Sequence, residues 1–179
     1  MPSPADAGQE KTKHITTLDD WLRPREDERC RVSALHRTTI RLHTSDERSR
    51  LRHELEARQW LGSYCGCLAE DVLRHERLRA LDNSELGGEE EGRKSVRKWL
   101  FECGVPFRAL VRAYYYNHDP HSIETTWKVF IRYWPVFLAP RDVVVTGADF
   151  QWVLAYCDEA SSLIFGTNHT KPPWEARVR

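Results

Sequence analysis

The chain has 179 residues, of which 40% are hydrophobic, and it carries equal numbers of basic and acidic side chains, 27 of each. Seven Trp, six Tyr and six Phe supply enough large apolar surface for a folded core, which excludes general disorder. No apolar run approaches the roughly 18 residues of a membrane span, and the N-terminal segment lacks the apolar core of a signal peptide. We therefore expect a cytoplasmic protein with no membrane partner.

The pattern along the chain predicts one domain with loose ends. Residues 1–13 are rich in Pro, Ala, Gly and charge, which predicts a flexible N-terminus. Residues 14–170 hold the periodic apolar segments and form the expected single domain, and residues 171–179 form a tail. The five cysteines are an odd set, which argues against a disulfide framework.

The first elements are predicted by their capping residues. Thr17 can cap a short helix that ends before Pro24. Residues 38–42 alternate and contain β-branched side chains, which predicts a strand. Thr44 and Glu47 have the spacing of a capping box, so a long helix is expected to begin there.

This long helix is predicted from a stripe of apolar residues. The stripe runs from Leu51 to Val72, mostly in steps of four residues, and a helical pattern resumes over residues 78–81. Residues 83–92 then combine turn-forming residues with an acidic run, which predicts a solvated loop.

Three consecutive amphipathic helices are predicted in the central part of the chain. Apolar residues recur at helical spacing over residues 96–103, and Gly104 is expected to end that helix in a left-handed conformation. The same spacing continues over residues 107–115 and again over residues 123–134.

The period changes from 3.6 to 2 towards the C-terminus. Strands are predicted over residues 143–145, 150–156 and 163–165, joined by turns, as in a β-meander. The middle strand is apolar on both faces, so at least one face should be covered by helices. The predicted fold class is therefore α+β, with a helical N-terminal and central part packed on a small antiparallel C-terminal β-meander.

The C-terminal meander resembles that of small bacterial immunity proteins and related families. The residues that carry the resemblance are Tyr133-Trp134, the stretch 142–156 with Asp149 and Trp152, and the closing residues 164–166. The resemblance implies a cytoplasmic, non-catalytic protein that neutralises a cognate toxin by binding and occluding it. We therefore expect a protein partner and no cofactor.

An acidic cluster gives the candidate contacts for such a partner. Glu89, Glu90 and Glu91 end the acidic run and could meet a basic surface on the partner by charge complementarity. A solvated linker is the simpler explanation of the same residues.

A nucleic-acid-binding regulator is the alternative function. Residues 92–141 carry nine basic and three acidic side chains, whereas residues 68–91 carry eight acidic and three basic ones. If the three central helices pack side by side, their arginines form one positive face that could hold nucleic acid by phosphate contacts. The candidate residues are Arg97, Arg108, Arg112 and Arg132. The solvated sides of three amphipathic helices would show the same residues.

An enzyme whose site assembles only in the fold is the second alternative. His118, Asp119 and His121 share one loop and could contribute to a metal site if another ligand joined them, although an exposed turn explains them as well. Phosphate-binding loops and nucleophile elbows are absent from the sequence. The sequence leaves the catalytic question open and favours a protein without catalytic, cofactor-binding or metal-binding residues.

Overall fold

The computed structural model describes most of the predicted domain. The described residues are 17–58, 60–61, 78–81, 90–116, 121–138, 142–157 and 162–167. The predicted ends, 1–13 and 171–179, lie outside them, so the domain boundaries stay a prediction. None of the helices in the described residues combines the length and the apolar character needed to cross a bilayer.

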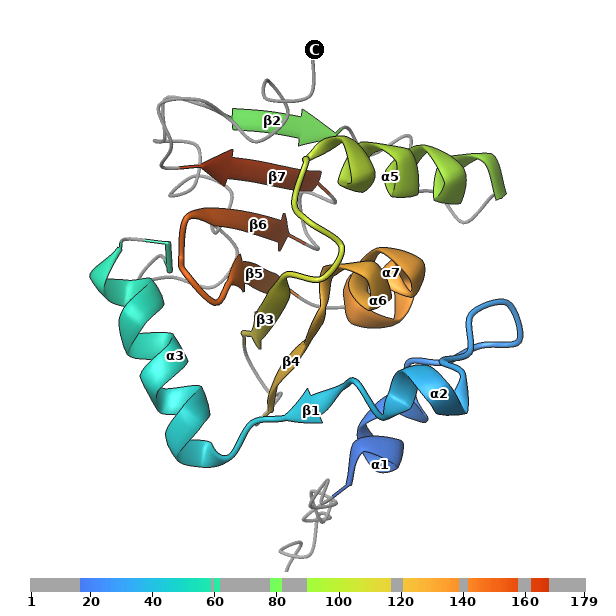
Figure 1. Ribbon diagram of the computed structural model, residues 1–179, viewed down its shortest axis with the longest axis horizontal. Coiled ribbons are helices and arrows are strands. Elements are labelled where there is room, and N and C mark those ends of the chain that lie inside the picture. Colours follow the sequence, from blue (N-terminus) through green and yellow to red (C-terminus); the bar gives the residue numbers. More distant parts are fainter. Residues whose placement is uncertain are drawn as a thin grey trace, which may run out of the picture.

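An antiparallel sheet of seven described strands forms the centre of the molecule (Figure 1). The strand order is β1-β4-β3-β5-β6-β7-β2, and each neighbouring pair is antiparallel. The strands are β1 Arg41–Leu42, β2 Leu78–Leu81, β3 Leu110–Tyr115, β4 Ser122–Thr126, β5 Val143–Gly147, β6 Trp152–Cys157 and β7 Ser162–Thr167. Helices pack on this sheet, which confirms the α+β class.

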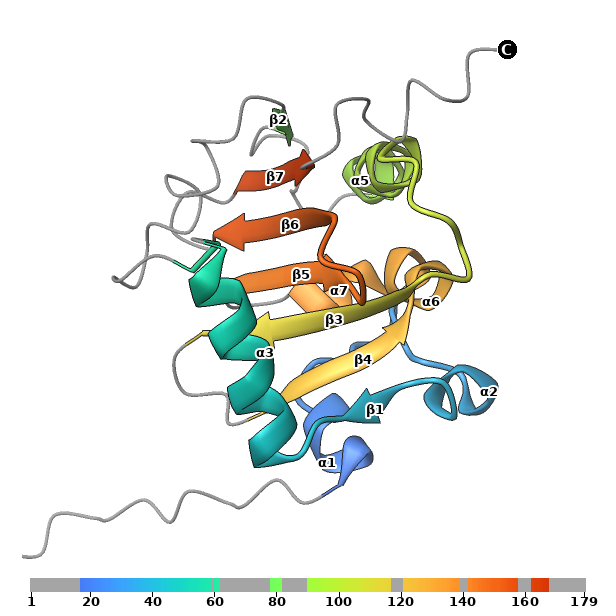
Figure 2. The same cartoon turned by 60° about the vertical axis from the view of Figure 1, so that its left-hand side comes forward.

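Helices lie on both faces of the sheet (Figure 2). The described helices are α1 Leu18–Leu22, α2 Ala34–Arg37, α3 Ser45–Ala57, α5 Glu90–Glu102, α6 Trp127–Arg132 and α7 Trp134–Leu138. Helix α3 crosses one face, and α5, α6 and α7 lie on the opposite face. The sheet therefore separates two helical layers.

Each helical layer has its own apolar cluster. On the α5–α6 side, Trp127 stacks on Phe130 with ring centroids 5.3 Å apart and meets the edge of Trp152 at 5.3 Å. On the α3 side, Leu51 and Leu55 pack on the other face of the same strands.

Strand β6 shows how the two clusters divide one strand. Trp152 and Leu154 belong to the cluster under α6, and Val153 and Ala155 belong to the cluster under α3. Alternate side chains of a strand point to opposite faces, so both faces are buried. The predicted meander and the predicted central position of this strand are thus confirmed.

The predicted helix ends are also confirmed. The Thr17 hydroxyl accepts a hydrogen bond from the Asp20 backbone N–H at 3.2 Å at the start of α1. Thr44 and Glu47 form a complete capping box at the start of α3. Gly104 follows α5 with φ of 77°, the left-handed conformation that favours glycine.

The predicted helix over residues 107–115 is wrong, because this segment forms strand β3. Val111, Ala113 and Tyr115 pack in the α5–α6 side cluster, and Tyr114 packs in the α3 side cluster. The apolar side chains of β3 fall on both of its faces, and a run of this kind also contains apolar pairs at helical spacing. Periodicity alone therefore could not identify this strand.

The other differences have related causes. The predicted third central helix, 123–134, begins as strand β4 and becomes helix α6 only after Thr126, whose hydroxyl caps α6. Residues 78–81 are the edge strand β2. The helix predicted from Thr44 ends at Ala57, and most of its expected continuation lies outside the described residues. The sheet therefore extends well beyond the predicted C-terminal meander.

A buried histidine joins the edge strand β1 to β4. The backbone N–H of His43 donates to the Ser122 carbonyl at 2.9 Å, and Nδ1 of His43 lies 2.7 Å from the Ser122 hydroxyl. Both residues are buried. Burial and the nearby Arg41 guanidinium lower the pKa of His43, and the neighbouring carboxylate of Glu124 only partly opposes them.

We predict that this histidine makes the fold sensitive to mild acid. Because the pKa of His43 lies below its unfolded value of 6.5, the unfolded chain binds the proton more tightly. The free energy of unfolding should therefore fall as the pH drops from about 7 to 5, by at most about 1.4 kcal/mol per pH unit. Urea unfolding of the wild type and of His43→Gln at several pH values measures this, and equal slopes in both proteins would contradict it.

Candidate functional site

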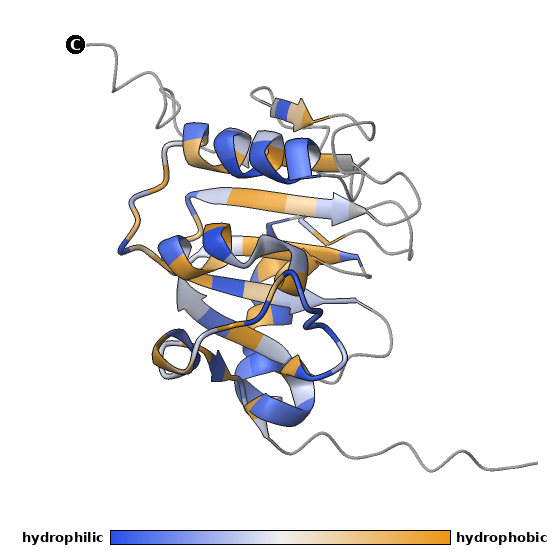
Figure 3. Cartoon of the chain, turned by 90° about the vertical axis from the view of Figure 1, so that its right-hand side faces the viewer, coloured by the Kyte–Doolittle hydropathy of each residue, from blue (hydrophilic) through white to orange (hydrophobic). Residues whose placement is uncertain are grey.

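Helices α5 and α6 and the loop between α1 and α2 enclose a groove on one side of the molecule. Helix α5 buries Val96, Trp99 and Leu100 against the core, so its charged residues face outward. Figure 3 views this side and shows the mainly hydrophilic ribbon of α5. The Arg97 guanidinium donates to the Arg132 carbonyl at 3.4 Å and so bridges α5 and α6.

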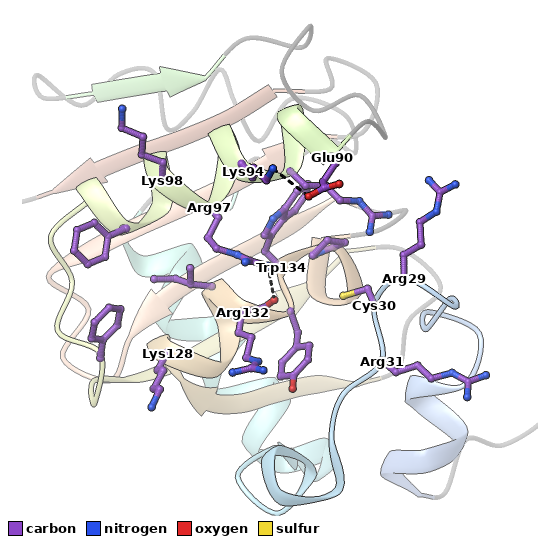
Figure 4. Close-up of a pocket in the computed structure, with 16 residues that line it drawn as sticks. Arg29, Cys30, Arg31, Glu90, Lys94, Arg97, Lys98, Lys128, Arg132 and Trp134 are labelled. Atoms are coloured by element: carbon purple, nitrogen blue, oxygen red, sulfur yellow. Dashed lines mark hydrogen bonds and ion pairs between the residues drawn. The ribbon is translucent and has the colours of Figure 1, made fainter.

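Positive charge dominates the groove, which has a volume of about 1310 Å³. Among its described lining residues, Glu90 is the one acidic side chain (Figure 4). Phe101 and Phe107 also line it, near the C-terminal end of α5. The cationic side chains are Arg93, Lys94, Arg97 and Lys98 from α5, Lys128 and Arg132 from α6, and Arg29 and Arg31 from the loop. We call this site the cationic groove.

Three of these cations are paired with carboxylates. The pairs are Arg93–Asp27 at 3.5 Å, Lys94–Glu90 at 3.1 Å and Lys98–Glu102 at 4.0 Å. The hydrogen bond to Glu90 raises the pKa of Lys94.

The remaining cations form no ion pair with any described carboxylate. They are Arg29, Arg31, Arg97, Lys128 and Arg132. Clustered like charges repel one another, and a bound anion relieves that repulsion. The groove is therefore built to receive negative charge.

Asp27 fixes the loop that supplies one wall. Its carboxylate accepts hydrogen bonds from the backbone N–H groups of Arg29 at 2.8 Å and Cys30 at 2.7 Å. Burial opposes ionisation, but these hydrogen bonds and the Arg93 guanidinium lower the pKa of Asp27. The ionised carboxylate ties the loop to α5 and holds Arg29 and Arg31 beside the groove.

Tyr133 forms part of the wall next to α6. Its hydroxyl accepts from the Ser33 backbone N–H at 3.3 Å and lies 2.8 Å from Nδ1 of His36. Burial opposes its ionisation, but the hydrogen bonds with Ser33 and the charge of Arg132 lower the pKa of Tyr133. These contacts connect the start of α2 to the α6–α7 junction.

The structure divides the four predicted nucleic-acid-binding arginines. Arg97 and Arg132 both line the cationic groove, where the Arg97 guanidinium contacts the Arg132 carbonyl. These two residues therefore lie on one positive face, as the nucleic-acid-binding hypothesis requires. Arg112 lies on β3, where its guanidinium is 2.9 Å from the Glu124 carboxylate. Arg108 lies in the turn before β3 and is exposed, outside the groove lining. The prediction that three helices present all four residues together is wrong, because β3 and β4 replace the expected helices.

The acidic candidates also fall in different places. Glu90 and Glu91 form the first turn of α5 instead of a loop, and Glu90 lines the groove beside Lys94. Glu89 lies outside the described residues.

The metal candidates are only partly described. His118 and Asp119 lie outside the described residues, whereas His121 directly precedes β4. Within the described residues, no group of three or more His, Cys, Asp or Glu side chains is placed to hold a metal ion. The metalloenzyme alternative therefore gains no support from this part of the chain.

Several groove residues were not identified from the sequence as part of a site. Arg29 and Arg31 belong to a charged stretch about 60 residues before α5, Phe107 belongs to the apolar stripe of a predicted helix, and Phe101 lies outside the predicted stripes. The density of arginines in that stretch is a signal, but only the packed structure places it beside α5. Comparison of the chain with protein-family models, curated proteins and solved structures finds no significant match.

We predict that Arg112 contributes to stability and Arg97 does not. Arg112→Gln leaves the half-buried Glu124 carboxylate with Arg41 alone, at 3.1 Å, and should lower the free energy of unfolding by about 1–2 kcal/mol. Arg97→Gln removes an exposed charge and should change it by less than about 0.5 kcal/mol. Denaturant unfolding of both variants tests this, and an equal decrease in the free energy of unfolding for both would refute the distinction between Arg112 and Arg97.

Proposed function

We propose that this chain is a non-catalytic binding protein whose cationic groove holds an acidic segment of a partner protein. The observation that carries the proposal is the set of five groove cations without an ion pair to a described carboxylate. A carboxylate that enters the groove can accept charge-assisted hydrogen bonds from Arg97 and Arg132, which both line it. Arginine is also the cation most enriched in protein interfaces.

The surroundings of the groove favour a protein over a nucleic acid. Asp27, Glu90 and Glu102 lie around the groove in ion pairs, and they would repel a continuous phosphate backbone. The edge of a partner protein can instead offer both signs of charge. The chain has no net charge and a pI of about 7.1, unlike the strongly basic domains that bind nucleic acid through phosphates.

In its most specific form, we propose an immunity-type protein that acts in the cytoplasm by occluding a cognate toxin. The resemblance of the meander β5–β7 to immunity proteins supports this form, and the groove supplies a surface with which such a protein could bind. The residues proposed to contact the toxin are then the groove cations and not the acidic candidates, because Glu90 already pairs with Lys94.

Binding of single-stranded nucleic acid is the second candidate. Phe101 and Phe107 line the groove near Lys98, and aromatic rings beside cations suit base stacking and phosphate contact. In this candidate function, Arg97 and Arg132 remain predicted nucleic-acid contacts, and Arg108 and Arg112 do not.

The first test measures binding of a fluorescein-labelled oligo-glutamate peptide and of labelled oligo(dT) by anisotropy. Arg97→Gln/Arg132→Gln should weaken peptide binding about tenfold, and raising the salt concentration should weaken it further. Arg23→Gln/Arg50→Gln is the matched control, because both arginines are exposed and lie outside the groove.

Three outcomes separate the candidates. Loss of peptide binding in the groove variant and not in the control supports the proposal. Tighter binding of oligo(dT), with the same dependence on Arg97 and Arg132, establishes the second candidate instead. Equal binding by wild type, groove variant and control refutes a function for the groove.

A second experiment tests the immunity-type form. Tagged wild type and Arg97→Gln/Arg132→Gln are used to capture partners from native lysate treated with nuclease, and mass spectrometry identifies them. One stoichiometric toxin, captured only by the wild type, is expected. Capture of the same toxin by both proteins would place its binding surface elsewhere.

A further inference from the structure

An apolar cluster lies at one end of the cationic groove. Four large apolar side chains are exposed in the described part of the chain, and two of them, Phe101 and Phe107, line the groove. The rings of Phe101 and Phe107 are 5.6 Å apart and tilted by 39°, and they are 44% and 47% exposed. Exposed apolar groups that cluster in this way mark binding sites more often than isolated ones do.

The two aromatic rings come from separate elements. Phe101 lies in the last turn of α5, and Phe107 lies in the turn that precedes β3. The backbone N–H of Lys128 donates to the Phe107 carbonyl at 3.0 Å, which fixes this turn against the start of α6. The two rings are thus held on anchored backbone and form a preorganised apolar end to the groove.

The length of α5 sets the length of the groove along this helix, and Arg97 lies about one helical turn from Phe101. Glu90 and Phe101 both line the groove and are eleven residues apart on this helix. At 1.5 Å per residue the helix spans about 17 Å between them. An extended segment of about five residues covers the same distance.

We propose that the occupant is a short amphipathic acidic segment, with one apolar side chain packed against Phe101 and Phe107 and carboxylates paired with Arg97 and Arg132. This inference rests on the proposed function and deepens it by naming the chemistry of the partner segment. Charge complementarity selects the acidic part, because one described carboxylate faces eight cations. The exposed rings of Phe101 and Phe107 favour an apolar residue in the segment, because an aromatic or aliphatic side chain that packs on them removes apolar surface from water.

Two labelled peptides test this inference with the full chain. The first has one tryptophan followed by about five glutamates, and the second has alanine in place of the tryptophan. The wild type should bind the tryptophan peptide about tenfold more tightly than the alanine peptide. Phe101→Ala/Phe107→Ala should remove that preference and leave the affinity for the alanine peptide unchanged.

The control variant is Leu35→Ala. Leu35 is exposed and apolar but lies outside the groove lining, so its replacement should leave the preference intact. Circular dichroism and thermal unfolding of each variant check that the fold is retained.

The outcomes distinguish this inference from the proposed function. Equal affinities of the wild type for both peptides, with loss of both in Arg97→Gln/Arg132→Gln, would overturn the apolar anchor and leave the acidic groove standing. A preference that survives in Phe101→Ala/Phe107→Ala would also overturn it. Tighter binding of oligo(dT) than of the tryptophan peptide would replace the acidic segment by nucleic acid.

Discussion

Burial of the central strands on both faces is the constraint on which the rest of the structure depends. Strand β5 buries Val143 and Val145 in the α5–α6 side cluster and Val144 in the α3 side cluster, and β6 divides its side chains in the same way. A sheet with two apolar faces must be covered twice. One layer therefore holds α3 and the other holds α5, α6 and α7, and the cationic groove lies where two helices of the second layer meet a loop.

The same packing makes the groove rigid. Val96, Trp99 and Leu100 fix helix α5 in the core, so the backbone positions from which its outward-facing cations project are fixed as well. Arg93 pairs with Asp27 across to the loop, and Arg97 reaches the backbone of α6. A charged site on well-packed elements is preorganised, so an anion that binds there loses little of its binding energy to rearrangement of the protein.

Local signals were sufficient for some elements and failed for others. Caps such as the Thr44 box, the left-handed Gly104 and the alternation of the C-terminal strands depend on neighbours close in sequence, and the sequence predicts them correctly. Strand β3 depends on pairing with β4 and β5, and its apolar spacing alone does not distinguish it from a helix. Arg97 and Arg112 look alike in the sequence, yet the partner of Arg112 is Glu124 on the next strand. Only tertiary pairing separates the structural arginine from those of the groove.

The carboxylates beside the groove also influence how it selects a ligand. Its cations sit beside the carboxylates of Asp27, Glu90 and Glu102, which reduce the field that the groove projects into solution. At physiological salt the screening length is about 8 Å, so little long-range attraction is left. The cations without such pairs act mainly within that length and most strongly at contact, where an anion displaces water and meets them directly. Selection in the groove therefore depends on fit and on hydrogen-bond geometry more than on electrostatic steering.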